Sequence, residues 1–286
     1  MDEHSTLLYI MLSQMKGIGP VSQTSLLKLC GGDIKQCFEM DEEDLYRLNE
    51  TLPAGQRLAG TKIGAFLSGR NSTEKRYEAK AVLESCKNLG ISVITKEDIH
   101  YPGRFSSLPD MPCLLYVKGR LAINDCSVSA GIVGARRCTP EDKGKAILTA
   151  EQEVKKGNAI VSGMAKGIDS YAHTAALKSG GYTIAVLGNG PDICYPKEHQ
   201  TLYEAIAQMG CVVSEYPPGM TPRSYMFPRR NRLIAALSDK LYIIGAGRNS
   251  GTNTTAAFCR KYQRWSRDID SIHLDHYNKI TSDIWK

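Results

Sequence analysis

The 286-residue sequence contains no hydrophobic run long enough to cross a membrane. A transmembrane helix needs roughly 20 consecutive apolar residues, and the apolar runs here are much shorter. The first residues carry two acids, Asp2 and Glu3, ahead of an apolar stretch that no small-residue cleavage site follows, which is not the pattern of a secretory signal. The sequence therefore predicts a cytoplasmic protein that does not contact a membrane.

The nine cysteines lack the spacing of a metal site. Their number is odd, no two of them form a Cys-x-x-Cys pair, and no histidine stands at ligand spacing from them. Cysteines scattered in this way are typical of reduced thiols, most of them buried as small hydrophobic side chains. The sequence therefore predicts no metal site, and it indicates no cofactor.

The sequence also lacks internal repeats and low-complexity linkers, and its charge is only moderately unbalanced. The formal net charge is +6 and the isoelectric point is about 8.7. This excess favours a polyanionic partner, although many proteins that bind no nucleic acid are equally basic. The positions of the basic residues are therefore more informative than their number.

Residues 1–85 have the pattern of a small helical domain. Two short amphipathic segments flank Lys16–Pro20, and helical signals continue over Asp41–Asn49 and about Ser72–Asn88. A Gly-Ile-Gly turn between two helices occurs in helix-hairpin-helix modules, where backbone N–H groups contact a nucleic-acid phosphate. A plain corner between two helices, which needs glycine for a positive φ, explains the same turn.

Short apolar runs alternate with helix-length segments in the rest of the chain. Continuous apolarity marks strands that are buried on both faces, and their alternation with helices indicates a parallel sheet. We therefore predict an α/β, Rossmann-like domain over residues 86–262, with a mostly parallel sheet and helices on both faces, followed by an atypical tail at 263–286. The expected strands are Ile91–Ile94, Leu114–Val117, Val128–Val133, Ala159–Ser162, Tyr182–Leu187, Cys211–Ser214 and Leu241–Ile244.

Two polar side chains stand where helices of this domain should begin, and a histidine follows one of them. Thr139 is followed by proline and two acids, which predicts a helix N-terminus with Thr139 as its N-cap. Asp169 is expected to cap the next helix, and His173 follows four residues later on the same face, so an Asp–His pair is available. No Ser or Cys nucleophile accompanies the pair, so we interpret Asp169 and His173 as structural.

Two glycine-rich turns follow neighbouring strands of the predicted sheet. Turns of this kind lie at the carboxyl edge of a parallel sheet, where backbone N–H groups and helix N-termini can face an anion. We therefore predict a phosphate site there. Its candidate residues are Ser162, Gly163, Lys166 and Gly167 in the first turn and Gly188 and Gly190 in the second.

Arginines are expected beside these turns. The loop after the Val128–Val133 strand holds Gly134, Arg136 and Arg137, and loops of this type meet ligands at the carboxyl edge. Arg136 could instead pack on the sheet edge or pair with Asp169. Thr139, at the end of the loop, is expected to contact a phosphate only in addition to its capping role.

A second arginine cluster spans residues 222–232 and contains two aromatic residues and no acid. A guanidinium can bind phosphates while a neighbouring ring stacks on an unpaired base, so this combination suits single-stranded nucleic acid. A solvated basic face is the alternative interpretation. The candidate ligands in this cluster are Arg229, Arg230, Asn231 and Arg232.

Five segments in the right order and spacing resemble the DprA/Smf family of DNA-processing proteins. They cover residues 131–140, 160–177, 183–196, 214–219 and 227–238. The resemblance implies a Rossmann-like domain that binds single-stranded DNA in a basic pocket, forms a homodimer and loads the RecA recombinase during natural transformation of competent cells. It implies a binding protein of DNA recombination and not an enzyme.

The resemblance also assigns positions to the binding residues. The family motif G-[SA]-R-x-x-[ST] falls on Gly134, Ala135, Arg136 and Thr139, and the phosphate-binding glycine loop falls on residues 162–167. Lys197 and the arginines of the second cluster would complete the basic lining. The chain departs from the family after the last expected strand, because residues 263–286 do not match its final strand.

Two other functions are compatible with the same broad fold. Phosphoribohydrolases that act on nucleoside monophosphates resemble this chain in a Gly-Thr turn near the end of the sheet, but they carry a glutamate shortly after it. Here Gly251 and Thr252 are followed by Asn-Thr-Thr-Ala, without an acid. A nucleotide-binding sensor would use the same pocket for a mononucleotide. The single-stranded DNA-binding mediator remains the leading hypothesis.

Overall fold

The computed structural model describes residues 2–126, 128–245 and 251–262. The chain divides into two compact units, which we call the helical unit (residues 1–101 and 105–116) and the sheet unit (residues 102–104 and 117–286). The helical unit extends past residue 85 because apolar side chains near residues 91 and 113–116 join the core that its helices form.

The helical unit is built around the buried side chains of its first helix, including Tyr9, Ile10 and Leu12. Asp2 caps this helix by accepting a hydrogen bond from the N–H of Ser5 at 2.9 Å. Its elements are α1 (Glu3–Gln14), α2 (Pro20–Leu29), α3 (Ile34–Glu39), α4 (Glu42–Thr51), the 3₁₀ turn η1 (Ala54–Gln56), α5 (Gly60–Arg70), α6 (Thr73–Asn88) and β1 (Ile91–Thr95).

The turn between α1 and α2 contains Gly17 at φ = 84°, a backbone conformation that favours glycine. The ammonium group of Lys62 donates a hydrogen bond to the Gly17 carbonyl at 2.5 Å and so ties α5 to this turn. The corner between two helices is therefore present as expected. Contact of this turn with a phosphate stays a prediction.

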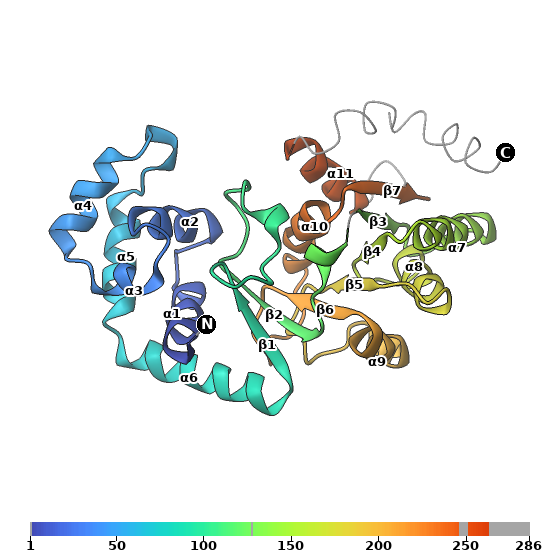
Figure 1. The fold of residues 1–286 in the computed structure, drawn as a ribbon, viewed down its shortest axis with the longest axis horizontal. Helices are drawn as coiled ribbons and strands as arrows, with labels where there is room; N and C mark the ends of the chain where they lie inside the picture. Colours follow the sequence, from blue (N-terminus) through green and yellow to red (C-terminus); the bar gives the residue numbers. More distant parts are fainter. Residues whose placement is uncertain (1, 127, 246–250, 263–286) are drawn as a thin grey trace. The chain divides into compact units, whose positions relative to one another are not determined.

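The sheet unit contains five neighbouring parallel strands in the order β6-β5-β4-β3-β7 (Figure 1). All seven strands expected from the sequence are present, with ends that differ by at most two residues. The bounds are β2 (Leu114–Gly119, at the division between the units), β3 (Ser129–Gly134), β4 (Ala159–Ser162), β5 (Thr183–Val186), β6 (Cys211–Ser214) and β7 (Lys240–Ile244).

Helices cover both faces of these strands, as the sequence predicted. Helices α7, α8 and α9 pack together on one face, and α10 and α11 pack together on the other (Figure 1). The bounds are η2 (Gly103–Phe105), η3 (Ile123–Asp125), α7 (Pro140–Lys155), α8 (Ile168–Lys178), η4 (Lys197–His199), α9 (Gln200–Met209), α10 (Met226–Leu237) and α11 (Thr252–Lys261).

The central strands are buried along their whole length, which explains their continuous apolar sequence. Ile132, Ile160, Ile184 and Val212 are inaccessible to solvent. Burying one such side chain stabilises a fold by about 1.5–3 kcal/mol. The sheet is therefore a rigid frame, and the loops at its carboxyl edge are positioned by it.

The starts of α7 and α8 differ in how well the sequence predicted them. Thr139 caps α7 as expected: its hydroxyl accepts from the N–H of Asp142 at 3.1 Å, and the Asp142 carboxylate accepts from the Thr139 N–H at 3.2 Å. The prediction for α8 was wrong, because Gly167 is the N-cap and Asp169 lies in the first turn. Gly167 adopts φ = 79°, which lets the chain enter the helix directly from a tight loop.

None of the helices in the described residues is both long and apolar enough to span a lipid bilayer. Within the same residues, His, Cys, Asp and Glu side chains do not gather into a group of three or more that could hold a metal ion. All nine cysteines are free thiols.

Candidate nucleic-acid interface

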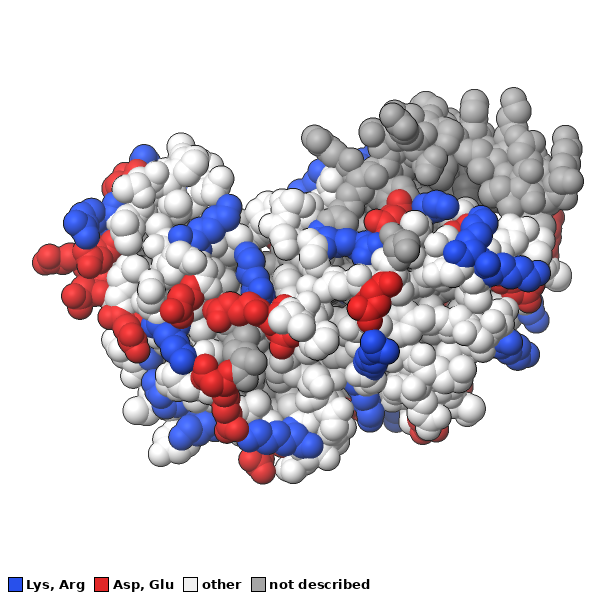
Figure 2. Space-filling view, in the orientation of Figure 1, with Lys and Arg blue, Asp and Glu red and all other residues white. Residues whose placement is uncertain are grey.

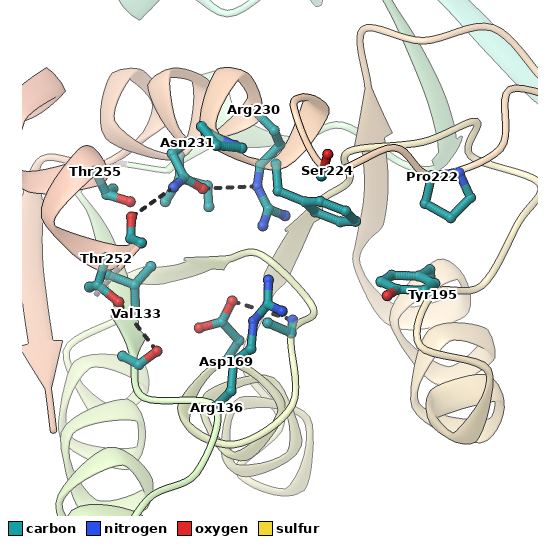
Figure 3. A pocket seen from close by; sticks show the side chains of 16 residues that line it. Val133, Arg136, Asp169, Tyr195, Pro222, Ser224, Arg230, Asn231, Thr252 and Thr255 are labelled. Carbon is teal, nitrogen blue, oxygen red and sulfur yellow. Dashed lines mark hydrogen bonds between the residues drawn. The ribbon is translucent and has the colours of Figure 1, made fainter. Parts of the chain in front are cut away.

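A cavity of about 510 Å³ opens at the carboxyl edge of the sheet unit. It is bounded by the loop after β3, the loop before α8, the segment that enters α10 and the start of α11 (Figure 3). Its lining includes the side chains of Arg136, Asp169, Tyr195, Ser224, Phe227, Arg230, Asn231, Thr252 and Thr255.

Arg230 places a buried positive charge in the wall of this cavity. One guanidinium nitrogen, Nη1, donates to the carbonyl of Gly163 at 2.6 Å and to that of Val186, and Nε donates to Oδ1 of Asn231 at 3.2 Å. Burial lowers the pKa of Arg230 to about 10, while Asp169 raises it and Arg136 lowers it further. The side chain is still cationic at neutral pH, and its orientation is fixed.

Gly163 provides the space that Arg230 occupies. A Cβ at this position would lie 2.5 Å from Nη2 of Arg230 and 2.6 Å from its Cζ, so any side chain here would displace the guanidinium. The glycine therefore contributes to the cavity by admitting the arginine, and its N–H donates to the carboxylate of Asp169.

Asp169 organises the loop that precedes α8. Its carboxylate accepts from the N–H groups of Gly163 at 3.2 Å and Ala165 at 3.3 Å. Burial raises the pKa of Asp169, and Arg230 and these N–H groups oppose that shift. The carboxylate lines the same cavity as Arg136 (Figure 3), and it balances part of the charge of Arg230.

Arg136 is the exposed cation of the cavity. Its guanidinium carbon lies 6.0 Å from the centre of the Phe227 ring, within the range of a cation–π interaction. No ion pair between Arg136 and a carboxylate is present in the part of the chain that the structure describes. The side chain is therefore available to an anionic ligand.

Aromatic side chains form the wall next to Arg136. The rings of Tyr195 and Phe227 lie 5.5 Å apart at an angle of 35°, and Tyr195 is 44% exposed. Gly188 lies beneath this wall, where a Cβ would stand 3.0 Å from Cδ1 of Phe227. The sequence placed two aromatic residues among the arginines, and one of them, Phe227, lines the cavity. It did not identify Tyr195, which belongs to a different loop.

Asn231 and the start of α11 complete the cavity. Nδ2 of Asn231 donates to the carbonyl of Gly251 at 3.2 Å, and the hydroxyl of Thr252 donates to the carbonyl of Gly134 at 3.3 Å. These bonds join α10, α11 and β3 (Figure 3). Thr252 and Thr255 were not candidates from the sequence, although the Ser-Gly-Thr turn before α11 was a usable signal.

Several predicted ligands lie outside the cavity with their side chains already committed. The hydroxyl of Ser162 is buried and donates to the carbonyl of Ile132 at 2.5 Å. Arg232 is buried in an ion pair with Glu215 at 2.5 Å. The structure does not bring these two side chains to the cavity, because each is used inside the sheet unit.

The remaining candidates surround the cavity without lining it. Gly167 approaches the loop after β3 so closely that a Cβ would lie 2.7 Å from the carbonyl oxygen of Arg136. Gly190 donates to the carbonyl of Met220 at 2.8 Å. Lys166 is exposed and forms an ion pair with Glu198. The exposed side chains of Arg137, Thr139, Lys197 and Arg229 are also outside the lining.

His173 fastens α8 to the sheet and does not pair with Asp169. Its Nδ1 lies 2.7 Å from the hydroxyl of Thr183, which donates its own hydrogen to the carbonyl of Ile160 at 3.0 Å. Nδ1 must therefore carry the proton of a neutral imidazole. Burial lowers the pKa of His173 to about 3, and Arg230 and His199 lower it further.

Charge is not gathered into one broad patch on the face of the molecule that Figure 2 shows. Basic and acidic side chains are interspersed there. The arrangement that distinguishes the cavity is therefore local: one buried and one exposed arginine beside two aromatic rings.

A sequence model described as DNA recombination-mediator protein A matches residues 92–270. The chain belongs to this family. It is 34% identical to Protein Smf of Synechocystis over 263 residues, which are 91% of this chain and 62% of that protein. It is 40% identical to DNA processing protein DprA of Streptococcus pneumoniae over 172 residues, 60% of this chain and 59% of that one.

Two solved structures are similar to this chain. The X-ray structure of DprA from Streptococcus pneumoniae has a TM-score of 0.71 at 28% identity, covering 92% of this chain and 86% of that one. A structure of DprA from Helicobacter pylori, whose title concerns a single-stranded DNA binding mode, has a TM-score of 0.56 at 35% identity and covers 61% of this chain and 78% of that one. The resemblance to the DprA/Smf family is confirmed, and the chain spans about three-fifths of the length of these curated relatives.

Proposed function

We propose that the protein is a recombination mediator that binds single-stranded DNA at the cavity of the sheet unit, and that it acts by binding and not by catalysis. The observation that carries this proposal is the convergence of Arg136, Arg230 and the Tyr195–Phe227 wall on one cavity. The Helicobacter pylori relative, whose title refers to single-stranded DNA binding, supports the same ligand.

The chemistry of the cavity suits an unpaired strand. Arg136 and Arg230 supply charge-assisted hydrogen bonds to phosphate oxygens, and the aromatic wall offers a surface on which a base can stack. The bases of a duplex are stacked on one another and unavailable. Arg137, Lys166, Lys197 and Arg229 surround the cavity, and we assign them to contacts with the strand as it leaves.

The cavity does not favour hydrolysis of a nucleotide. Asp169 is the one acid among the lining residues in the described part of the chain, and its carboxylate already accepts two backbone hydrogen bonds. A cavity of about 510 Å³ is large enough for a mononucleotide. A nucleotide sensor is therefore the second candidate, and it would show saturable binding without any gain from longer oligonucleotides.

The variant Arg136→Ala tests the assignment of the cavity. It should weaken binding of a fluorescent oligothymidylate by about tenfold to a hundredfold, because a charge-assisted hydrogen bond contributes about 1.5–3 kcal/mol. The slope of log K against log salt should flatten by about 0.7 for each phosphate that the variant no longer neutralises. Arg120→Ala, which removes an exposed arginine outside the cavity, is the matched control. An Arg136→Ala slope equal to that of the control would contradict the assignment.

The same proposal has three further parts: the protein loads the RecA recombinase, it forms a homodimer, and it acts in natural transformation in the cytoplasm. The family description, recombination mediator, supports the first of these. We expect the purified protein to accelerate assembly of RecA on strands coated with single-strand-binding protein, and light scattering to give twice the chain mass. If the Arg136→Ala variant accelerates RecA assembly as much as the parent protein does, RecA loading does not depend on DNA binding in the cavity.

A further inference from the structure

The segment between β6 and α10 supplies two residues of the cavity wall, and the first turns of α10 supply four more. Residues 216–231 contribute six of the lining residues: Pro222, Ser224, Phe227, Pro228, Arg230 and Asn231. The two residues that flank this stretch, Glu215 and Arg232, are joined to each other by an ion pair at 2.5 Å. The pair therefore closes the base of the segment.

Both members of this pair are almost fully buried, with 6% of each side chain exposed. Their hydrogen bonding is incomplete: Nη1 of Arg232 is buried and has no hydrogen-bond partner among the described residues. Burying two charges costs free energy that such a pair repays only when its remaining donors and acceptors are satisfied. Stabilisation of the fold is therefore a poor explanation for this pair.

The rest of the segment is fastened at a different place. The N–H of Gly219 donates to both carboxylate oxygens of Asp192, at 2.9 and 3.0 Å, and the carbonyl of Met220 accepts from the N–H of Gly190. These bonds attach the outer part of the segment to the turn after β5. The Glu215–Arg232 pair ties the start of the segment directly to α10, the helix carrying Arg230 and Asn231.

We infer that Glu215 and Arg232 are positioning residues for the cavity: their ion pair sets the placement of the β6–α10 segment, and neither side chain contacts the strand. The expected effect of the ion pair on DNA binding rests on the proposed function. The expected effect of the ion pair on the position of the segment does not depend on any ligand.

Amide hydrogen exchange of the free protein tests the placement directly. In Glu215→Gln and in Arg232→Met, peptides covering residues 216–225 should exchange at least tenfold faster than in the parent protein, and peptides of α7 should be unchanged. Glu141→Gln, which breaks the α7 ion pair between the exposed Glu141 and Lys145, is the matched control. Unchanged exchange over residues 216–225 would overturn the inference whether or not the protein binds DNA.

Binding of oligothymidylate distinguishes positioning from direct contact and from general stabilisation. Arg232→Met should weaken binding about fivefold to tenfold while keeping the salt slope of the parent protein, whereas a flatter slope would show that Arg232 meets a phosphate. In Glu215→Met/Arg232→Met no unpaired charge is left, so the melting temperature should recover while binding stays weak. Recovery of both the melting temperature and the affinity in the double variant would overturn the inference. Failure of the parent protein to bind oligothymidylate would refute the proposed function alone.

Discussion

Gly163 and Arg230 show at the scale of single residues how the cavity depends on a missing side chain. The guanidinium passes through the space above Gly163 and donates to its carbonyl at 2.6 Å. The pattern of glycines in this loop predicts close approach of a phosphate to the backbone. The structure shows that Arg230 makes such a close approach to Gly163, and contact of the loop with a phosphate stays a prediction.

Gly163→Ala should therefore displace Arg230. A Cβ would lie 2.5 Å from Nη2, and relief of such overlap in a packed interior costs about 1–3 kcal/mol. We expect the free energy of unfolding in urea to fall by that amount and affinity for single-stranded DNA to fall about tenfold. Gly144→Ala is the matched control, because a Cβ there meets nothing within 4 Å and alanine favours the helix by about 0.5–1 kcal/mol. Equal affinities of the two variants would contradict this role of Gly163.

The sequence identified arginines that line the cavity, but it did not show which candidate side chains are already bonded to other parts of the protein. Arg136 and Arg230 were candidates and do line the cavity. Arg232 and Ser162 were candidates too, but their partners, Glu215 and Ile132, are distant in sequence. A pattern cannot show that a side chain is already satisfied by a distant group.

At the scale of elements, the start of α7 allows the capping role of Thr139 to be distinguished from a role in binding DNA. The capping box between Thr139 and Asp142 satisfies N–H groups at the start of the helix. Thr139→Ala should lower the free energy of unfolding by about 1 kcal/mol and leave affinity for single-stranded DNA unchanged below the unfolding transition. Thr139→Ser keeps the hydroxyl and should retain stability. A drop in affinity for the alanine variant alone would show that Thr139 contacts the strand as well.

Helix α8 should make the stability of the sheet unit dependent on pH. The folded pKa of His173, about 3, lies below its ordinary value of 6.5, so the unfolded chain takes up this proton first. The stability contributed by the neutral imidazole is therefore complete above pH 6.5 and is lost as pH falls toward 3, by up to about 1.4 kcal/mol per pH unit. Asp169, whose pKa is raised, acts in the opposite direction.

Urea unfolding between pH 7 and pH 4 measures this dependence. His173→Gln should be less stable at pH 7, because the bond to Thr183 is removed, and should lose less stability on acidification than the parent protein. His4→Gln, at an exposed position of α1, should follow the parent protein at every pH. Parallel curves for the parent and the His173→Gln variant would contradict the burial of a neutral imidazole.

Regular elements were predictable where one physical signal dominates. The strands of the sheet unit are buried on both faces, so they appear as continuous apolar runs. Helix α3 was missed because it has six residues, and α5 was missed because it contains Gly60, Gly64 and Gly69, which lower helix propensity. The expected end of the chain, residues 263–286, lies outside the described residues.

At the scale of the whole molecule, the sequence family and the fold both identify a DprA/Smf protein. Single-stranded DNA as the ligand of the cavity is the central proposal. The matched region, residues 92–270, includes every element that lines the cavity. The net charge of +6 is small for a chain of this length, so binding should depend on the local arginines more than on a general attraction. The affinity should therefore fall with salt with a slope set by a few phosphates.

Single-strand binding is tested most directly by a titration of the purified protein at two salt concentrations. The ligands are a fluorescent single-stranded oligonucleotide, the matched duplex and a mononucleotide. We predict that the single strand binds more tightly than the duplex, that its affinity falls as salt rises, and that the mononucleotide binds much more weakly. Equal affinity for duplex and single strand, or mononucleotide binding as tight as that of the longer strand, would contradict a cavity built for single-stranded DNA.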